Sequence, residues 1–405
     1  MKILTISQVY WPDTASVSQH LTDLLEALVK KGHTVTVLTS RNNYENPTIH
    51  YRKRNTNNGV IIKRILNTSF GKKTKAGRIT DFLSFNFLIG LKMLFISKKT
   101  YDLIIGLTSP PLLSYVGIKI ALWKKIRFLY WTMDLQPELS IISGYLQSNS
   151  KTATSLQKKG DFIFKNSDII ITLDNYMTEH IKARVGNRDN IVSVPVWSVM
   201  NKVYNGRRLE NPFRIENKFK HKIVIMYSGN HAVVHSLDTL IEVETRLKND
   251  DRFLFVHIGS GVRLNDVIKN KKKHNLENVI LLPYQPREKI HLSLGSSDIQ
   301  VVVLGDDCVG YTHPNKVYGA MYIGKPILYI GPEPSHVSEI INDIDGNIMV
   351  NHGEVDSLIN KLDVFAKLSL TEREKIGKSN SQIANMNFLP STLINRMIDI
   401  IEYKN

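Results

Sequence analysis

The sequence predicts an α/β protein with two doubly wound, parallel-sheet domains in tandem. Its 405 residues are too many for one ordinary hydrophobic core and suit two domains of about 200 residues each. Strand and helix signals alternate through the first half of the chain, and the same alternation starts again at Ile223. With 42% hydrophobic and 22% charged residues, the chain has the composition of a folded globular protein.

The first forty residues predict a strand, a helix and a second strand. Ile3–Ile6 is a short apolar run, and leucines then recur at helical spacing from Val17 to Leu28. Gly32 ends this helix, and Thr34–Leu38 is again strand-like. Such a βαβ unit implies a parallel sheet. The other strands predicted for this half are Leu103–Leu107, Phe128–Trp131, Ile169–Leu173 and Ile191–Val194.

The second half repeats the pattern after a polar stretch. Residues 201–222 are polar and basic without clear periodicity, so they predict an interdomain linker. We therefore expect an N-terminal domain at 1–200 and a C-terminal domain at 223–385. The final helical segment, 386–405, could pack back on the N-terminal domain. The strands predicted for the C-terminal domain are Ile223–Tyr227, Phe253–Ile258, Val279–Leu282, Ile299–Val303 and Ile327–Ile330.

The net charge of +16 is concentrated in the first half of the chain. Residues 1–200 contain 27 Lys and Arg against 13 Asp and Glu, or +14, whereas residues 201–405 contain 26 against 24, or +2. No acidic residue lies between Tyr51 and Arg78, where the basic residues are Arg52, Lys53, Arg54, Lys63, Arg64, Lys72, Lys73, Lys75 and Arg78. An anionic partner is therefore expected to meet this half.

Ile79–Ile96 is the most apolar stretch, but Asp81 and Lys92 interrupt it, so it falls short of the ~18 apolar residues of a spanning helix. Its basic flanks suit a helix that lies in the interface of an anionic membrane; the alternative is an ordinary buried helix. No signal-peptide pattern precedes the first strand, and the single cysteine, Cys308, fits a reducing compartment. We expect a cytoplasmic protein, peripheral at the inner face of the cell membrane.

Two loops of the second half are candidate sites, because open parallel sheets bind ligands beyond the carboxyl ends of their strands. They are Tyr227–His231 and Gly310–Gly319. In the second loop, Asn315 precedes a predicted helix, so backbone N–H groups and Lys316 could bind a diphosphate. The alternative for Lys316 is a solvated surface lysine. The glycine-rich turn at Gly259 lacks the full dinucleotide fingerprint and is a weak signal alone.

Two loops of the first half are candidate acceptor sites. Asp134 and Glu138 follow a predicted strand, where a carboxylate can orient an attacking hydroxyl or accept its proton. The alternative role for Asp134 is a helix cap or a loop hydrogen bond. Thr14, Ala15 and Ser16 are small residues that open the first helix, so a ligand can approach closely.

Several segments along the chain match the motifs of one known family. They are Gly32–Thr39 (Gly-His-x-Val-Thr-Val-Leu-Thr), Asp134–Glu138 (Asp-Leu-x-Pro-Glu), Ser228–Asn230 with Ser236–Leu240, and Pro314–Gly319 with Gly324–Pro326. Over nearly its whole length the chain therefore resembles the family-four glycosyltransferases. The resemblance is strongest to the bacterial branch that builds capsule, O-antigen and colanic-acid-like polymers.

This resemblance implies the GT-B fold, in which two Rossmann-like domains face each other across a cleft. It further implies a nucleotide-sugar donor on the C-terminal domain, an acceptor on the N-terminal domain, retention at the anomeric carbon, and no metal or other cofactor. Asp134 and Lys316 are then the expected catalytic residues. The expected acceptor contacts are Thr14, Ala15, Ser16, Asp134 and Glu138, and the expected donor contacts are Gly229, Asn230, His235, Gly259, Asn315, Lys316, Tyr318 and Glu339.

The sequence departs from the family's pattern at the donor site. The family's two glutamates, eight residues apart, fall on Tyr311 and Gly319, and neither residue is acidic. Its donor-domain Arg and Lys fall near Asn230 and His235. Lys316 and backbone amides would then have to stabilise more of the diphosphate's charge.

The expected reaction is transfer of a hexose or N-acetylhexosamine derivative from a UDP-sugar to a lipid-diphosphate-linked saccharide, in cell-surface polysaccharide synthesis. Two other classes stay open. One is a UDP-sugar 2-epimerase of the same fold. The other is a non-enzymatic basic protein that binds a membrane or a nucleic acid, and the tandem α/β sheets and the two ligand loops rank this class last. Asp306 and Asp307 lack a third ligand nearby in sequence, so we expect no metal there.

Overall fold

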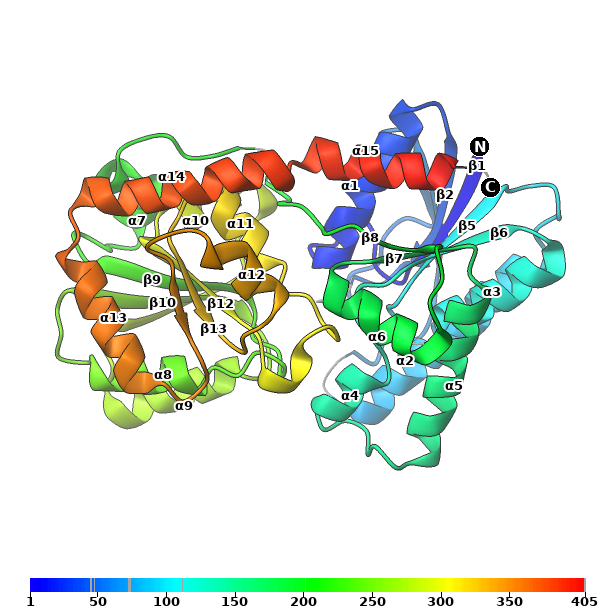
Figure 1. Cartoon of the computed structure of the whole chain (residues 1–405). Coiled ribbons are helices and arrows are strands. Elements are labelled where there is room, and N and C mark those ends of the chain that lie inside the picture. Colours follow the sequence, from blue (N-terminus) through cyan, green and yellow to red (C-terminus); the bar gives the residue numbers. More distant parts are fainter. Residues whose placement is uncertain (44–45, 47, 72–73, 111, 201, 404–405) are drawn as a thin grey trace. The chain divides into compact units, whose positions relative to one another are not determined.

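The computed structural model describes residues 1–43, 46, 48–71, 74–110, 112–200 and 202–403. Of the basic run between 51 and 78, Lys72 and Lys73 and the side chains of Lys75 and Arg78 lie outside this description. Residue contacts divide the chain into two compact units (Figure 1). Unit 1 comprises Met1–Pro195, Gly310–His313 and Ser391–Asn405; unit 2 comprises Val196–Val309 and Pro314–Pro390.

Unit 1 contains an eight-stranded sheet with the order β3-β4-β2-β1-β5-β6-β7-β8. Neighbouring strands are parallel except β3 and β4, which are antiparallel. The central strands are almost wholly buried, as expected for parallel strands covered on both faces. The strands are β1 Lys2–Ile6, β2 Thr34–Ser40, β3 Arg54–Asn57, β4 Val60–Ile65, β5 Leu103–Leu107, β6 Arg127–Trp131, β7 Ile169–Thr172 and β8 Ile191–Ser193.

Three helices of unit 1 begin at a side chain that caps them. Thr74, Ser150 and Asp174 accept hydrogen bonds from backbone N–H groups in the first turns of α2, α5 and α6. These caps fix where each helix starts beside the sheet. The helices are α1 Ser16–Lys30, α2 Lys75–Leu94, α3 Leu113–Lys124, α4 Glu138–Ile142, α5 Lys151–Asn166, α6 Asn175–Val185 and α15 Pro390–Glu402.

The hairpin of β3 and β4 differs from the sequence prediction, which has no strand within the basic run. Asn58 (φ 45°) and Gly59 (φ 85°) form its two-residue turn, and positive φ at both positions is typical of Asn-Gly hairpin turns. β3 lies at the edge of the sheet and has no apolar residue, so hydropathy does not reveal it. Arg54 and Lys63 of the basic run are therefore paired across a hairpin.

Unit 2 contains a six-stranded, all-parallel sheet with the order β11-β10-β9-β12-β13-β14. The strand order reverses between β9 and β12, which is where such sheets bind ligands. The strands are β9 Ile223–Asn230, β10 Phe253–Ser260, β11 Val279–Leu282, β12 Ile299–Val303, β13 Ile327–Ile330 and β14 Ile348–Val350. The helices are α7 Pro212–Glu216, α8 Asp238–Arg246, α9 Leu264–His274, α10 Ile290–Gly295, α11 Lys316–Tyr322, α12 His336–Asn342, α13 Val355–Lys367 and α14 Leu370–Asn387.

The predicted linker needs a correction, because residues 202–222 form part of unit 2. They include α7, and Phe213 and Phe219 are buried in a core cluster with Val224 of β9. Arg214 is fully buried, and its Nη1 donates to the Ser296 carbonyl at 2.7 Å. Two buried phenylalanines and the hydrogen bonds of Arg214 hold this segment, but its apolar residues follow no regular period, so its sequence resembles a linker. The boundary between the units falls at Pro195.

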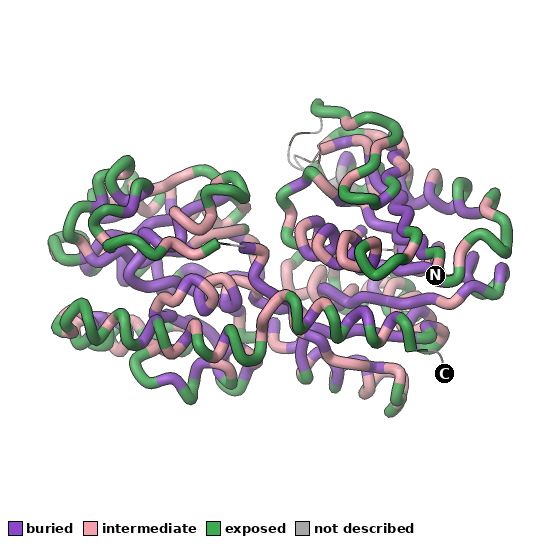
Figure 2. The backbone as a smooth tube through the Cα atoms, turned by 90° about the horizontal axis from the view of Figure 1, so that it is seen from above, coloured by how far each residue is buried: buried purple, intermediate pink, exposed green. Residues whose placement is uncertain are grey.

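The last helix, α15, clusters with unit 1 from Ser391 onward. Its buried face carries Leu393, Met397, Ile398 and Ile401. At its end, the Glu402 carboxylate lies 2.8 Å from Nε2 of His33. In Figure 2, buried and exposed positions alternate along the helices of each unit.

Candidate functional site

Four of the predicted donor residues converge at the carboxyl edge of the sheet in unit 2. Gly229 (φ 137°), the last residue but one of β9, pairs in the register with Gly259 (φ 130°) of β10. A Cβ on Gly259 would lie 2.1 Å from the Gly229 carbonyl oxygen, and one on Gly229 would lie 2.7 Å from Cε of Lys316. Only glycine fits at these two positions, and their backbone leaves room for the lysine stem.

Lys316 is the first residue of α11 and is partly buried. Its Nζ lies 3.5 Å from Nε2 of His235 and 4.9 Å from the centroid of the Tyr227 ring. Burial lowers the pKa of Lys316 to about 8. Nδ1 of His235 lies 3.0 Å from the Val303 carbonyl, which only accepts, so Nε2 is left to face the lysine. Burial, and then the nearby Lys316 charge, holds the pKa of His235 well below 6.5.

The other predicted donor residues have different surroundings. Asn230 is exposed at the end of β9, and Asn315 immediately precedes α11. Tyr318 is buried against Phe388, and its hydroxyl lies 2.9 Å from Nε2 of His336, which gives this tyrosine a packing role. Glu339 is exposed on α12, after β13.

In unit 1, Asp134 pairs with a segment that comes from far along the sequence. Thr312 Oγ1 donates to Asp134 Oδ1 at 2.7 Å, and the two residues also form an isolated antiparallel bridge. The Leu135 N–H donates to the Tyr311 carbonyl at 2.8 Å. Burial raises the pKa of Asp134, although the Thr312 hydrogen bond and the nearby His313 oppose that rise. Sequence reasoning missed Thr312 as a partner, because 178 residues separate the two.

A second buried pair lies beside this bridge. Nδ1 of His313 is 2.7 Å from Oδ2 of Asp174, and both side chains are almost fully buried. Asp174 Oδ1 also accepts from the Met177 N–H at the start of α6. Sequence reasoning missed the pair, although the loop that contains His313 was among the candidate sites.

The remaining acceptor candidates lie at other loops of unit 1. Glu138 Oε1 is 2.9 Å from Arg184, which also pairs with Asp161 at 2.8 Å, so this carboxylate has a structural partner. Thr14 and Ala15 lie in the loop after β1, and α1 starts at Ser16. β1 and β5 are neighbours at the point where the strand order of this sheet reverses, so that loop follows a ligand-binding edge.

A groove of about 580 Å³ lies on unit 1 between the hairpin and α2. Its described lining is entirely apolar or basic: Leu38, Ile65, Leu66, Leu88, Leu91 and Phe95 with Arg41, Lys53, Arg54, Lys63, Arg64 and Lys92. Beside it, one stripe of α2 exposes Ile79, Leu83, Phe87, Leu91 and Leu94, while Phe85, Ile89 and Met93 are buried. Among the residues described, no helix has the length and hydropathy needed to cross a membrane.

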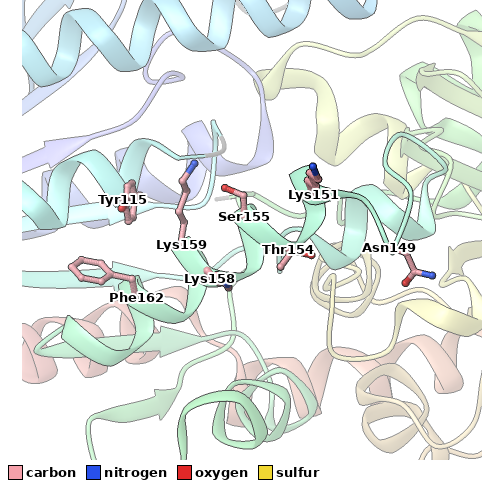
Figure 3. A pocket seen from close by; sticks show the side chains of 8 residues that line it. All are labelled: Tyr115, Asn149, Lys151, Thr154, Ser155, Lys158, Lys159 and Phe162. Carbon is pink, nitrogen blue, oxygen red and sulfur yellow. The ribbon is translucent and has the colours of Figure 1, made fainter.

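A second basic pocket, of about 550 Å³, lies on α5 and α3 (Figure 3). Lys151, Lys158 and Lys159 of α5 line it together with Tyr115 of α3. Lys159 Nζ lies 5.8 Å from the centroid of the Tyr115 ring. Unit 1 therefore has two concave surfaces that can attract anions.

Comparison with known proteins agrees with the predicted family. Residues 210–382 match the family model for glycosyl transferases group 1. The probable glycosyltransferase WbjE of Pseudomonas aeruginosa is 22% identical over 242 residues, which are 60% of this chain and 60% of WbjE. The putative colanic acid biosynthesis glycosyl transferase WcaI of Escherichia coli (strain K12) is 22% identical over 377 residues, which are 89% of this chain and 90% of WcaI.

Solved structures share the whole fold. Sucrose-phosphate synthase from Thermosynechococcus elongatus matches with a TM-score of 0.79 and 13% identity, over 99% of this chain and 98% of that one. HepE of Anabaena, in complex with UDP and glucose, matches with a TM-score of 0.73 and 14% identity, over 99% of both chains. The predicted fold class is confirmed. The chain therefore has the GT-B fold, and residues 210–382 match the group 1 glycosyl transferases.

Proposed function

We propose that this enzyme transfers a hexosyl or N-acetylhexosaminyl group from a UDP-sugar to a lipid-diphosphate-linked saccharide, in the synthesis of a bacterial cell-surface polysaccharide. The observation that carries the proposal is the Lys316 cation at the ligand-binding edge of the group 1 domain, packed on Gly229 and next to His235. The name of WcaI supports the polysaccharide, and the HepE complex supports UDP.

In the proposed reaction, the acceptor hydroxyl oxygen forms a bond to the anomeric carbon as the bond from that carbon to the diphosphate breaks. UDP leaves with the electron pair, and configuration is retained. Lys316 and the N–H groups at the start of α11 stabilise the negative charge on the diphosphate, in the place of a metal ion. Asp134 accepts a hydrogen bond from the acceptor hydroxyl and orients it, and the hydroxyl proton passes to the diphosphate oxygen of the departing UDP.

The surface of unit 1 supports a lipid-linked acceptor. The exposed apolar stripe of α2 can enter the interface of a bilayer, and the basic rim of the neighbouring groove can bind anionic headgroups or a diphosphate. An exposed Trp123 with Lys98 and Lys124 near its ring adds a residue type that favours membrane interfaces. We therefore propose that the protein binds peripherally to the inner face of the cell membrane.

The test is a nucleotide-sugar screen followed by a transfer assay. UDP and UDP-sugars should raise the melting temperature, because they bind the folded protein alone. Transfer to a lipid-diphosphate-linked saccharide should then proceed with and without EDTA, with retained configuration in the product. Acceptor-free conversion of the UDP-sugar to an epimer would contradict transfer, and loss of activity in EDTA would contradict the metal-free part of the proposal.

A further inference from the structure

A series of buried, hydrogen-bonded ionisable side chains leads from α8 to Gly229, one of the predicted donor residues. Glu244 Oε1 lies 2.6 Å from Nε2 of His257, and Nδ1 of His257 lies 3.2 Å from Nε2 of His231. Nδ1 of His231 in turn lies 3.1 Å from the carbonyl oxygen of Gly229. Exposure of the three ionisable side chains is at most 1%. The proposed reaction uses none of them.

These hydrogen bonds fix how many protons the side chains of Glu244, His257 and His231 hold together. The Gly229 carbonyl only accepts, so Nδ1 of His231 must donate to it. A neutral imidazole carries one N–H, so Nε2 of His231 accepts from Nδ1 of His257. The third bond then needs a proton between His257 and Glu244. It lies either on a neutral Glu244 acid or on a doubly protonated His257 beside a carboxylate.

Both arrangements have zero net charge, and in both a neutral His231 donates to Gly229. The neutral form of His231 is favoured because burial, His257 and Lys316 together lower its pKa to about 3. The two imidazoles and the carboxyl group therefore hold three protons together. Two neutral imidazoles beside a carboxylate would hold only two. Removing Glu244 removes the acid that makes this proton count possible.

The Gly229 carbonyl, at the end of this series of hydrogen bonds, lies among the predicted donor residues. Gly229 has φ 137°, its carbonyl lies against Gly259, and its Cα lies against the stem of Lys316. A rotation of the Gly229–Asn230 peptide would therefore disturb the backbone on which the lysine packs. We propose that Glu244 and His257 are positioning residues for the nucleotide-sugar donor, because they force His231 to hold the Gly229 carbonyl beside Lys316.

This inference rests on the proposed function, and two measurements test it. Nitrogen-15 NMR of the histidine side chains reads their tautomers directly. In the wild type we expect His231 to be protonated at Nδ1 and His257 to carry a proton on Nδ1. His231 protonated at Nε2 alone would overturn the inference, and this result does not depend on any variant folding.

The second measurement is the affinity for UDP, compared among variants of α8. Glu244→Gln should bind UDP within about twofold of the wild type, because its amide N–H can donate to His257 without any ionisable proton. Glu244→Ala should bind about tenfold more weakly, since the hydrogen-bonded chain is broken. Glu242→Ala, at an exposed position of the same helix, is the matched control and should bind like the wild type.

The outcomes separate the two proposals. If the wild type binds UDP and Glu244→Ala binds it equally well, the positioning role is wrong while the proposed function stands. If the wild type binds no UDP, the proposed function is wrong and the positioning role fails with it. If Glu244→Ala binds weakly and Glu244→Gln restores both affinity and the His231 tautomer, the inference is supported.

Discussion

Lys316 has two properties that distinguish it from a solvated surface lysine. It is partly buried, and none of the described acidic residues forms an ion pair with it. Since burial lowers its pKa to about 8, the side chain is charged below that pH and loses its charge above it. The neighbouring His235 and His231 stay neutral in this range, because their pKa values lie far lower.

We therefore expect the affinity for UDP to fall as pH rises from 7 to 9. At pH 7, Lys316→Ala should bind UDP at least about tenfold more weakly, because a charge-assisted contact to the diphosphate is lost. Its remaining affinity should change less with pH than that of the wild type. Calorimetric titrations at several pH values measure both effects. Equal affinity in the variant and the wild type would show that the donor site is misplaced.

Asp134 and Glu138 are the two candidate carboxylates of the acceptor loop, and their surroundings differ. Glu138 is held by Arg184, whereas Asp134 accepts from the Thr312 hydroxyl, a bond that an asparagine oxygen can also accept. Asp134→Asn should lower turnover by about 100-fold or more and leave UDP affinity unchanged, because it removes the carboxylate that orients the acceptor. Glu138→Gln serves as the matched control and should lower turnover much less. If both variants lost turnover equally, the different roles assigned to the two carboxylates would be wrong.

At the scale of elements, α2 presents apolar residues on two sides. Its inner side packs in unit 1, whereas Phe87 and the following Phe95 are 70% and 82% exposed. Each such ring would stabilise membrane binding by about 1.5–3 kcal/mol if it entered the lipid. The basic groove next to α2 would add an attraction that salt weakens.

The double variant Phe87→Ser, Phe95→Ser should therefore bind vesicles containing phosphatidylglycerol at least about tenfold more weakly in a flotation assay. Its UDP affinity should stay unchanged, since both side chains lie on unit 1. The matched control is Val364→Ser on α13 of unit 2, where the valine is 62% exposed. If the double variant and the wild type float equally, α2 is not the membrane contact.

The strands that the sequence reveals best are continuous apolar runs. β5, β11, β12 and β13 have the predicted bounds, because such runs between helices are typical of parallel strands. β3, β4 and β14 escape prediction for local reasons: β3 has no apolar residue, β4 contains Lys63 and Arg64 of the basic run, and β14 has only three residues. Short or charged strands carry little hydrophobic pattern, so the sequence alone does not reveal them.

The candidate site also contains residues that the sequence predicts and contacts that it does not predict. Gly229, Gly259 and Lys316 could be predicted together, since the two glycines lie at the carboxyl ends of parallel strands, Lys316 follows a third strand, and the carboxyl ends of such strands share one edge. The contacts of Asp134 with Thr312, and of Asp174 with His313, could not, because no local pattern reports a pairing over such distances along the chain. At Tyr311, where the family has a glutamate, the ring stacks on His180 at 4.2 Å between centroids.

At the scale of the whole molecule, the chain passes between the two units more than once. It leaves unit 1 after Pro195, returns for Gly310–His313, and returns again from Ser391 to the end. A segment of residues 1–195 alone would therefore lack the Thr312 and His313 partners of Asp134 and Asp174, and the buried face of α15. Unit 1 therefore depends on two segments from the second half of the sequence, although its sheet comes from the first half.

This dependence predicts a strong effect of a charge on the buried face of α15. Met397 is fully buried, whereas Arg396 beside it is exposed. Met397→Asp should lower the free energy of unfolding by about 3 kcal/mol or more, because it creates an unpaired buried charge and removes apolar packing. Arg396→Asp should change it by about 0.5 kcal/mol or less. Both can be measured by denaturant unfolding, in which Met397→Asp should keep the stabilisation by UDP, since the donor residues lie in unit 2. Equal stability of the two variants would mean that α15 does not support unit 1 in solution.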